Sequence, residues 1–173
     1  MNNHVTNFRR RWLNGTNFGI NKHQNYDDSY KLIHRPSGAF VSFIYKSYNN
    51  SLHITYGLTP NKYEGKGIGT ILRALATMFA IETRKRITQN GVANRPLKNL
   101  KTGVPISTYI LRNKLGWSKN NRGTGGHPSV FRVGNNNSKV RKVLRNWKLP
   151  KAPAKSPTTE TAVRQTKRRR TAA

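Results

Sequence analysis

The stretch that decides the fold runs from Leu52 to Phe79 and reads LHITYGLTPNKYEGKGIGTILRALATMF. Its first part alternates side chains between two faces, as a β-strand does. Its last part repeats apolar residues every three or four positions, which is typical of an amphipathic helix. Three glycines, Gly65, Gly67 and Gly69, lie between the two parts. The stretch therefore predicts a strand, a glycine-rich turn and a long helix, in that order.

The strand is predicted over Leu52–Leu58. One of its faces would carry Leu52, Ile54, Tyr56 and Leu58, and the other His53 and Thr55. The apolar stripe of the helix consists of Ile68, Ile71, Leu72, Leu75, Ala76 and Phe79. We expect this helix to end near Arg86, because the basic run Arg84–Arg86 complements the negative end of a helix dipole.

Further strands are predicted before this stretch, over Ser29–Ile33 and Gly38–Tyr45, with a hairpin turn at Asn49–Asn50. After it, Ser107–Leu115 resembles a shorter helix and Ser129–Val133 a closing strand. Consecutive strands joined by short turns pair antiparallel. The expected fold class is therefore α/β, with a mostly antiparallel twisted sheet and a central long helix after the glycine loop.

Both ends of the chain are less apolar than its middle, and residues 138–173 are its most basic part. We expect a basic N-terminal arm over residues 1–28, a domain over 29–137, and a basic Pro-, Ala-, Lys- and Arg-rich tail over 138–173 that is disordered from Pro150 onward. The tail would begin with a basic helix over Ser138–Trp147. An equal alternative for the N-terminal segment is that Phe8, Trp12 and Leu13 form a first helical turn or strand of the domain.

Composition restricts the class of protein. The 173 residues include 33 Lys and Arg against 5 Asp and Glu, a formal net charge of +28, and no cysteine. The missing cysteines exclude a disulfide scaffold, an iron–sulfur cluster and a cysteine nucleophile. The five histidines are scattered, so we expect no metal site. We also expect no membrane span and, because Met1–Gly15 has no apolar core, no secretory signal peptide.

The charge predicts a polyanionic partner, since solubility alone needs far less of it. We expect nucleic-acid binding that is largely independent of sequence, because no base-reading module is recognisable. The residues expected to contact phosphate are Arg9, Arg10, Arg11, Arg84, Lys85, Arg86, Lys167, Arg168, Arg169 and Arg170. Lys167–Arg170 also fits a nuclear localisation patch. A nuclear or virion-associated location is expected, with cytoplasm and organelle as alternatives; DNA against RNA and the oligomeric state stay open.

The stretch Leu52–Phe79 resembles the GNAT acyltransferases, in which a strand leads into a loop of the form Q/R-x-x-G-x-G/A and a long amphipathic helix. Here that loop reads EGKGIG over Glu64–Gly69. A second family motif, Tyr-x-Lys-Leu-Gly-Phe, resembles RNKLGW over Arg112–Trp117. The resemblance covers about residues 29–133. It implies an N-acetyltransferase domain that binds acetyl-CoA.

The resemblance also implies which residues hold the cofactor. In the family the loop wraps the pyrophosphate of acetyl-CoA, and a backbone N–H of the bulged strand polarises the thioester carbonyl. The corresponding cofactor-binding residues are Gly57, Leu58, Lys62, Lys66, Gly67, Ile68, Gly69 and Thr70. For the glycines, the alternative is simply a tight strand-to-helix turn.

Two residues are the catalytic candidates. His53 stands where some family members carry a glutamate base, and Tyr109 lies one helical turn before the usual tyrosine acid. The alternatives are a solvent-facing strand position for His53 and helix packing for Tyr109. The chain departs from the family pattern at Glu64, in place of Gln or Arg, and at Arg112, in place of that tyrosine.

Two functions therefore remain open. One is an N-acetyltransferase domain carried by a nucleic-acid-binding protein. The other is a catalytically inactive scaffold of the same fold that binds or packages nucleic acid, as a viral core, chromatin-like or ribosomal component would. A highly cationic enzyme would repel a free basic peptide, so the expected acceptor is anionic or bound to nucleic acid.

Overall fold

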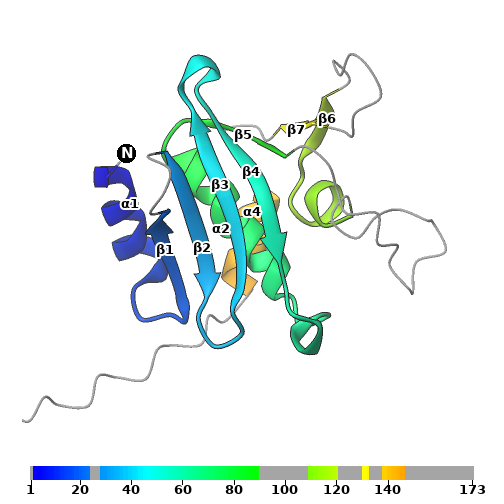
Figure 1. Ribbon diagram of the computed structural model, residues 1–173. Helices are drawn as coiled ribbons and strands as arrows, with labels where there is room; N and C mark the ends of the chain where they lie inside the picture. Colours follow the sequence, from blue (N-terminus) through cyan, green and yellow to red (C-terminus); the bar gives the residue numbers. More distant parts are fainter. Residues whose placement is uncertain (1, 24–27, 90–108, 121–129, 133–137, 147–173) are drawn as a thin grey trace, which may run out of the picture.

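The computed structural model describes residues 2–23, 28–89, 109–120, 130–132 and 138–146. A five-stranded sheet forms its centre (Figure 1), with the strands in the order β1-β2-β3-β4-β5. The strands are β1 (Phe18–Lys22), β2 (Ser29–His34), β3 (Ala39–Lys46), β4 (Ser51–Leu58) and β5 (Arg86–Gln89). Neighbours from β1 to β4 pair antiparallel, whereas β4 and β5 pair parallel. The predicted α/β class with a mostly antiparallel sheet is confirmed.

The helices and remaining strands follow in chain order. They are α1 (Asn2–Phe8), η1 (Arg9–Leu13), η2 (Ser47–Asn49), η3 (Asn61–Tyr63), α2 (Ile68–Glu82), η4 (Ile110–Lys114), β6 (Ser118–Asn120), β7 (Val130–Arg132) and α4 (Ser138–Asn146). Strands β6 and β7 form a separate antiparallel pair. No helix among the described residues is long and apolar enough to cross a membrane.

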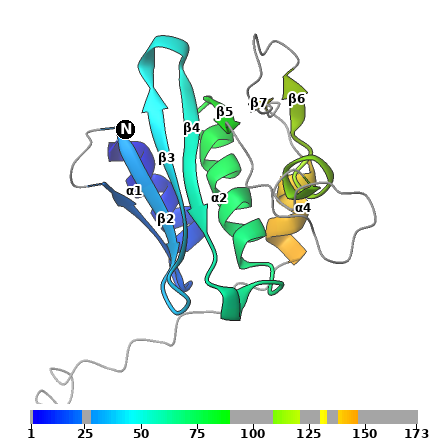
Figure 2. The same cartoon turned by 45° about the vertical axis from the view of Figure 1, so that its right-hand side comes forward.

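The helices α1 and α2 lie on the same face of the sheet (Figures 1 and 2). The core forms between them and the sheet, around the Phe79 ring of α2. That ring lies 5.1 Å from the ring of Phe8, 6.3 Å from Tyr30 and 5.7 Å from Phe43, measured between centroids. All six predicted stripe residues of α2 are buried. The amphipathic pattern therefore correctly identified the core side of this helix.

The N-terminal segment is part of the folded domain. Phe8 and Leu13, from α1 and η1, are buried in the core together with Phe18 and Ile20 of β1. Of the two alternatives that the sequence left open, the one with Phe8, Trp12 and Leu13 in the domain describes the structure. Because β1 pairs along its whole length with β2, the expected boundary at residue 28 falls between two neighbouring strands.

Strand β4 contains a bulge at Thr55, after which its side chains alternate in the opposite sense. Ser42 of β3 pairs with Tyr56, whereas the next residue, Phe43, pairs with Ile54, so Thr55 is an extra residue in the ladder. Such a bulge shifts the alternation of side chains by one position. Leu52 and Ile54 are buried, but Tyr56 is 57% and Leu58 45% exposed. The predicted common face for these four residues is therefore wrong in its second half.

Helix α2 ends earlier than predicted. The backbone N–H of Lys85 donates to Ala80 O and that of Arg84 to Ile81 O, while Arg84 takes a left-handed φ of 55°. This is a Schellman ending, here with arginine in the position that glycine usually takes. The last helical residue is Glu82, and Arg86 already belongs to β5.

The later predicted elements lie only partly within the described residues. Of the predicted helix Ser107–Leu115, the structure describes a π-helical turn over Ile110–Lys114, and β7 falls within the predicted strand Ser129–Val133. Helix α4 begins the predicted tail, and its Val140 and Leu144 are buried against the core. The predicted residues Lys167–Arg170 lie outside the described residues.

Candidate functional site

The candidate site lies where β4 passes into α2. The intervening turn contains η3 and two glycines with left-handed backbones, Gly65 at φ 76° and Gly67 at φ 79°. Only glycine adopts this conformation at little cost, since a Cβ would meet the neighbouring backbone. These two glycines bring the chain from the end of β4 into the first turn of α2.

The N-terminal end of α2 is open. Gly67 is its N-cap residue, so no side chain caps the helix, and its first turn contains no acidic residue. The first intrahelical bond is from the N–H of Ile71 to Gly67 O. The N–H groups of Ile68, Gly69 and Thr70 come before that residue and have no acceptor within the helix. They lie at the positive end of the helix dipole. Such an end favours an anion, above all a phosphate.

Two further glycines permit close packing at this end. A Cβ at Gly69 would lie 3.0 Å from Thr59 Oγ1, and a Cβ at Gly57 would lie 3.3 Å from both Arg73 Nη2 and Val41 Cγ2. Both distances are tighter than side chains normally allow. Gly57 of β4 and Gly69 of α2 therefore make room for the guanidinium of Arg73 between strand and helix.

Arg73 is a residue that the sequence analysis missed. Its Nη1 donates to Gly69 O at 3.2 Å, and its Nε is buried without a hydrogen-bond partner among the described residues. Burial lowers the pKa of its guanidinium. The sequence carried one signal for it: a charged residue directly between Leu72 and Ala74, both of which are buried. A partly buried cation whose buried Nε has an unused donor is suited to an anionic group.

The predicted lysines flank the glycine turn. The ammonium groups of Lys62 and Lys66 each lie 5.1 Å from the centre of the Tyr63 ring. The hydroxyl of Tyr63 donates to Pro36 O at 3.3 Å, which ties the turn to the β2–β3 connection. Both lysines are exposed, as is Glu64 between them. Two cations and one carboxylate thus border the open end of α2.

His53 lies further back on β4, paired with Thr88 of β5. Its Nδ1 and Thr88 Oγ1 are 2.8 Å apart. Burial, and secondarily the charge of Lys46, lower the pKa of the half-buried imidazole. A neutral imidazole is the form that accepts a proton, and the direction of the bond to Thr88 decides which nitrogen can do so. Four residues separate it from Gly57, roughly 13 Å along a strand.

Two histidines make the stability of the protein depend on pH. Burial lowers the pKa of His34 as well as that of His53 below the ordinary value of 6.5. At a pH between the lowered pKa of the folded state and the ordinary pKa of the unfolded chain, the unfolded chain binds more protons. Acidification therefore favours unfolding. We expect the urea midpoint to fall as the pH drops from about 7.5 to about 5.5. The fall should be smaller in His53→Gln and unchanged in the exposed His4→Gln; a pH-independent midpoint would contradict the assignment.

The second catalytic candidate, Tyr109, caps the start of η4 and is partly buried. The ammonium of Lys114 lies 5.9 Å from the centre of its ring. Arg112, at the position of the family's tyrosine, is exposed. Among the contacts that the structure describes, none joins Tyr109 to His53 or to the glycine turn. The role of Tyr109 stays a prediction.

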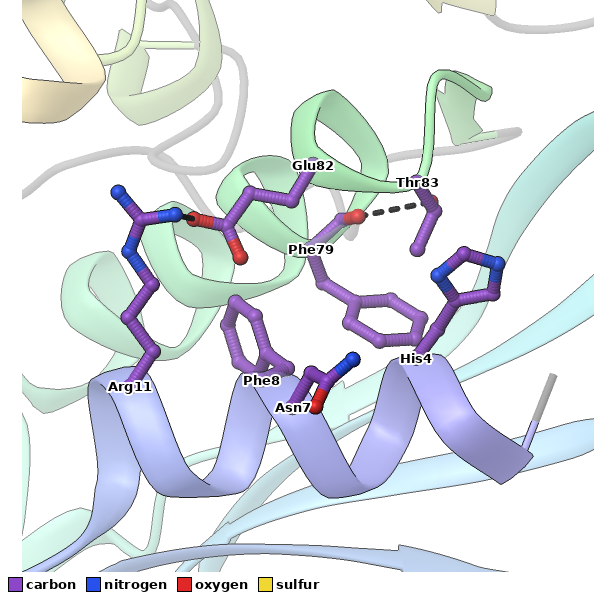
Figure 3. Close-up of a pocket in the computed structure, with 7 residues that line it drawn as sticks. All are labelled: His4, Asn7, Phe8, Arg11, Phe79, Glu82 and Thr83. Atoms are coloured by element: carbon purple, nitrogen blue, oxygen red, sulfur yellow. Dashed lines mark hydrogen bonds and ion pairs between the residues drawn. The ribbon is translucent and has the colours of Figure 1, made fainter.

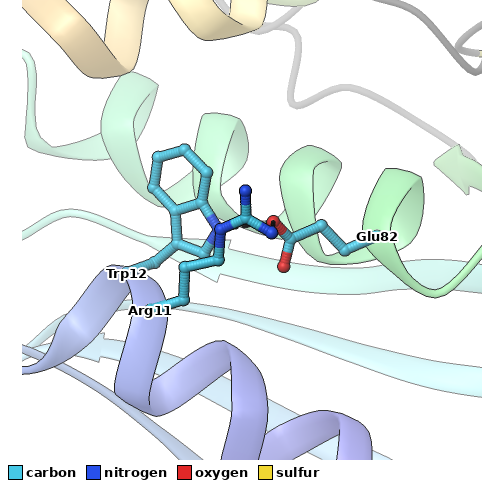
Figure 4. Close-up of polar contacts among 3 residues, drawn as sticks. All are labelled: Arg11, Trp12 and Glu82. Atoms are coloured by element: carbon cyan, nitrogen blue, oxygen red, sulfur yellow. Dashed lines mark hydrogen bonds and ion pairs between the residues drawn. The ribbon is translucent and has the colours of Figure 1, made fainter.

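The two basic runs, Arg9–Arg11 and Arg84–Arg86, lie near the C-terminal end of α2. Arg11 Nη1 lies 3.2 Å from Glu82 Oε1, and Trp12 Nε1 donates to the same oxygen at 2.8 Å (Figure 4). Arg84 follows Glu82 by two residues. Glu82 therefore holds the N-terminal run close to Arg84–Arg86. The sequence alone does not indicate this contact, because about 70 residues separate the two runs.

Within these runs, three cations are already engaged. Arg9 Nη2 donates to Ile20 O at 2.7 Å, Arg11 pairs with Glu82, and Lys85 Nζ donates to Asn50 Oδ1 at 2.9 Å. The exposed members are Arg9, Arg10, Arg84 and Arg86, together with Arg11, whose side chain is 68% exposed. These exposed arginines form the cationic surface that a polyanion could reach.

A cavity of about 280 Å³ lies between α1 and α2 (Figure 3). It is lined by His4, Asn7, Phe8, Arg11, Phe79, Glu82 and Thr83. Glu82 and Gly67 stand at opposite ends of α2, roughly 20 Å apart along a helix of this length. The cavity is therefore separate from the glycine turn. No group of three or more potential metal ligands occurs among the described side chains.

The chain was compared with known proteins. No protein-family model matches it, and no curated protein does. Among solved structures it is similar to the crystal structure of nourseothricin acetyltransferase, at 16% sequence identity and a TM-score of 0.39. The match covers 69% of this chain and 83% of that one.

Proposed function

We propose that this chain binds acetyl-CoA at the turn between β4 and α2 and transfers the acetyl group to an amine, in a protein whose cationic surface holds nucleic acid. The observation that carries the proposal is the uncapped N-terminal end of α2, entered through Gly65 and Gly67 directly after the bulged strand β4. This geometry agrees with the GNAT resemblance of the same residues.

The residues divide the work of binding. The N–H groups of Ile68, Gly69 and Thr70 receive the pyrophosphate, and Lys62 and Lys66 offset the charge of Glu64 beside it. Acetyl-CoA supplies a thioester, whose carbonyl carbon the acceptor amine attacks and whose thiolate leaves. A backbone N–H near Gly57–Leu58 stabilises the charge that develops on the carbonyl oxygen.

Proton transfer is assigned to side chains further along the chain. His53 takes the proton of the acceptor amine on Nε2, directly or through water, in the tautomer whose Nδ1–H donates to Thr88; its lowered pKa keeps it neutral at pH 7. Tyr109 is the proposed donor to the leaving thiolate. The acceptor is an anionic or nucleic-acid-bound amine, since the charge of +28 repels a free basic peptide.

Calorimetric titration with acetyl-CoA tests the proposal. About 0.5 M salt suppresses general attraction of an anion to this surface. We expect saturable one-to-one binding that neither ADP nor tripolyphosphate reproduces. Binding that disappears in salt, or that tripolyphosphate matches, would contradict it.

The second candidate function is a nucleic-acid-binding scaffold without turnover. It is favoured by the net charge and by the two departures from the family pattern, Glu64 and Arg112. It predicts nucleic-acid affinity that falls steeply with salt, because each neutralised phosphate releases counterions. A scaffold that lacks the cofactor site gives no salt-resistant binding in the same titration, and one that still binds acetyl-CoA is separated from the enzyme by its lack of acetyl transfer to an amine.

Replacing Arg73 separates binding from folding. Arg73→Met removes a partly buried cation and keeps an unbranched apolar side chain, a change that is often neutral or stabilising. If the guanidinium serves the bound anion, acetyl-CoA affinity at high salt falls about tenfold, as expected for a charged hydrogen bond, while the urea midpoint stays within error or rises. A large loss of stability with unchanged affinity would make Arg73 purely structural.

A further inference from the structure

The face of the sheet opposite α1 and α2 is open. Among the described residues no helix covers it, and in Figure 1 strands β2, β3 and β4 lie in front of α2. The strand register places two neighbouring rows of side chains on this face. One row is Lys31, Ser42 and Tyr56, and the other is Ile33, Phe40 and Leu58. We call these six residues the open face.

The open face is unusually apolar for a solvated surface. Tyr56 is 57% and Leu58 45% exposed, and they owe this exposure to the bulge at Thr55. The rings of Phe40 and Tyr56 lie 5.7 Å apart, in a tilted arrangement. An open sheet face is normally polar, so adjoining exposed aromatic and aliphatic side chains mark a surface for a partner.

The open face is also cationic. Lys31 Nζ lies 3.9 Å from the centre of the Phe40 ring. The guanidinium of Arg35 reaches across the neighbouring strand, where its Nη2 would lie 3.2 Å from a Cβ at Gly19. Strands β1 to β4 contain no acidic residue. The partner of this surface therefore carries negative charge.

We propose that the open face binds single-stranded nucleic acid, with a base stacked on Tyr56 and phosphates held by Lys31 and Arg35. Aromatic rings beside cations on an exposed sheet suit unpaired bases, whose faces a duplex keeps stacked on one another. A negatively charged protein surface would match the cations but not the exposed rings. The inference rests on the proposed nucleic-acid binding and gives it a site apart from the arginine runs.

The test compares two exposed tyrosines. Tyr56 lies on the open face, whereas Tyr48, 80% exposed, lies in η2 at the tip of the β3–β4 hairpin. Fluorescence anisotropy would measure binding of a labelled oligo(dT) of about 20 nucleotides and of a duplex of equal length. We expect Tyr56→Ala to weaken single-strand binding about tenfold and duplex binding little. Tyr48→Ala should leave both unchanged, and Lys31→Ala should reduce the salt slope by about one.

Each contrary result identifies a different failure. Equal single-strand affinity in Tyr56→Ala, Tyr48→Ala and the unaltered chain would overturn the open-face site. Nucleic-acid binding at the arginine runs would not be contradicted by that result. Absence of binding to either nucleic acid at about 0.15 M salt would refute nucleic-acid binding itself. A dimer that Tyr56→Ala converts to monomer in sedimentation would assign the face to a second copy. Photocrosslinking of halogenated oligo(dU) to Tyr56, mapped by mass spectrometry, should confirm the contact directly.

Discussion

Gly67→Glu is expected to abolish salt-resistant binding of acetyl-CoA. A glutamate at the N-cap position of α2 would put a carboxylate where the pyrophosphate is proposed to lie. Like charges at such short range and the loss of the open helix end should lower the affinity at least about 100-fold, or roughly 2.7 kcal/mol. Calorimetric titration at about 0.5 M salt measures this loss.

Gly15→Glu is the matched control for this variant. Gly15 has a φ of 71°, close to the 79° of Gly67, and open space around a Cβ. It lies between η1 and β1, the edge strand that β2 and β3 separate from β4. Both variants carry the same added charge and a similar backbone cost of about 1–2 kcal/mol. Equal affinities in the two variants would refute the glycine turn as the binding site.

Phe79→Ala is expected to have the largest effect on stability. The Phe79 ring is fully buried and contacts the rings of Phe8, Tyr30 and Phe43, which joins α1, α2 and the sheet. Truncating a buried phenylalanine to alanine costs about 3–5 kcal/mol, because apolar contacts are lost and a cavity remains. The total free energy of unfolding of a domain of this size is about 5–15 kcal/mol. The urea midpoint should fall by about a fifth or more.

Tyr48→Ala gives the comparison for an aromatic residue outside the core. At 80% exposure, its removal should change the free energy of unfolding by less than about 0.5 kcal/mol. If Phe79→Ala were as mild as Tyr48→Ala, α1 would not pack on α2 as the structure has it.

Local patterns in the sequence were sufficient for most of the sheet and for α2. The strands predicted over Ser29–Ile33, Gly38–Tyr45 and Leu52–Leu58 lie within one residue of β2, β3 and β4. The helix start at Ile68 also agrees, because the glycine turn and the first apolar stripe residue meet there. The predicted helix end does not agree, since the Schellman contacts depend on a left-handed backbone at Arg84, which arginine rarely adopts.

The candidate site was predicted in part. The glycine turn was identified from its own residues, because positive φ and an uncapped helix start are local properties. Arg73 was missed, because its contacts with Gly57 and Gly69 join a helix to a strand. The meeting of Arg11 with Glu82 was missed for the same reason.

The sequence by itself determined the charge of the protein, its three central strands β2 to β4 and the glycine-rich entry into α2, because composition and periodicity express these directly. The tertiary structure alone decided which way the end of β4 faces. A single extra residue at Thr55, set by pairing with β3, turns Tyr56 and Leu58 from the core to the open face. Strand register is set by pairing between strands that lie apart in the sequence. The alternation of side chains within one strand therefore cannot reveal where the register shifts.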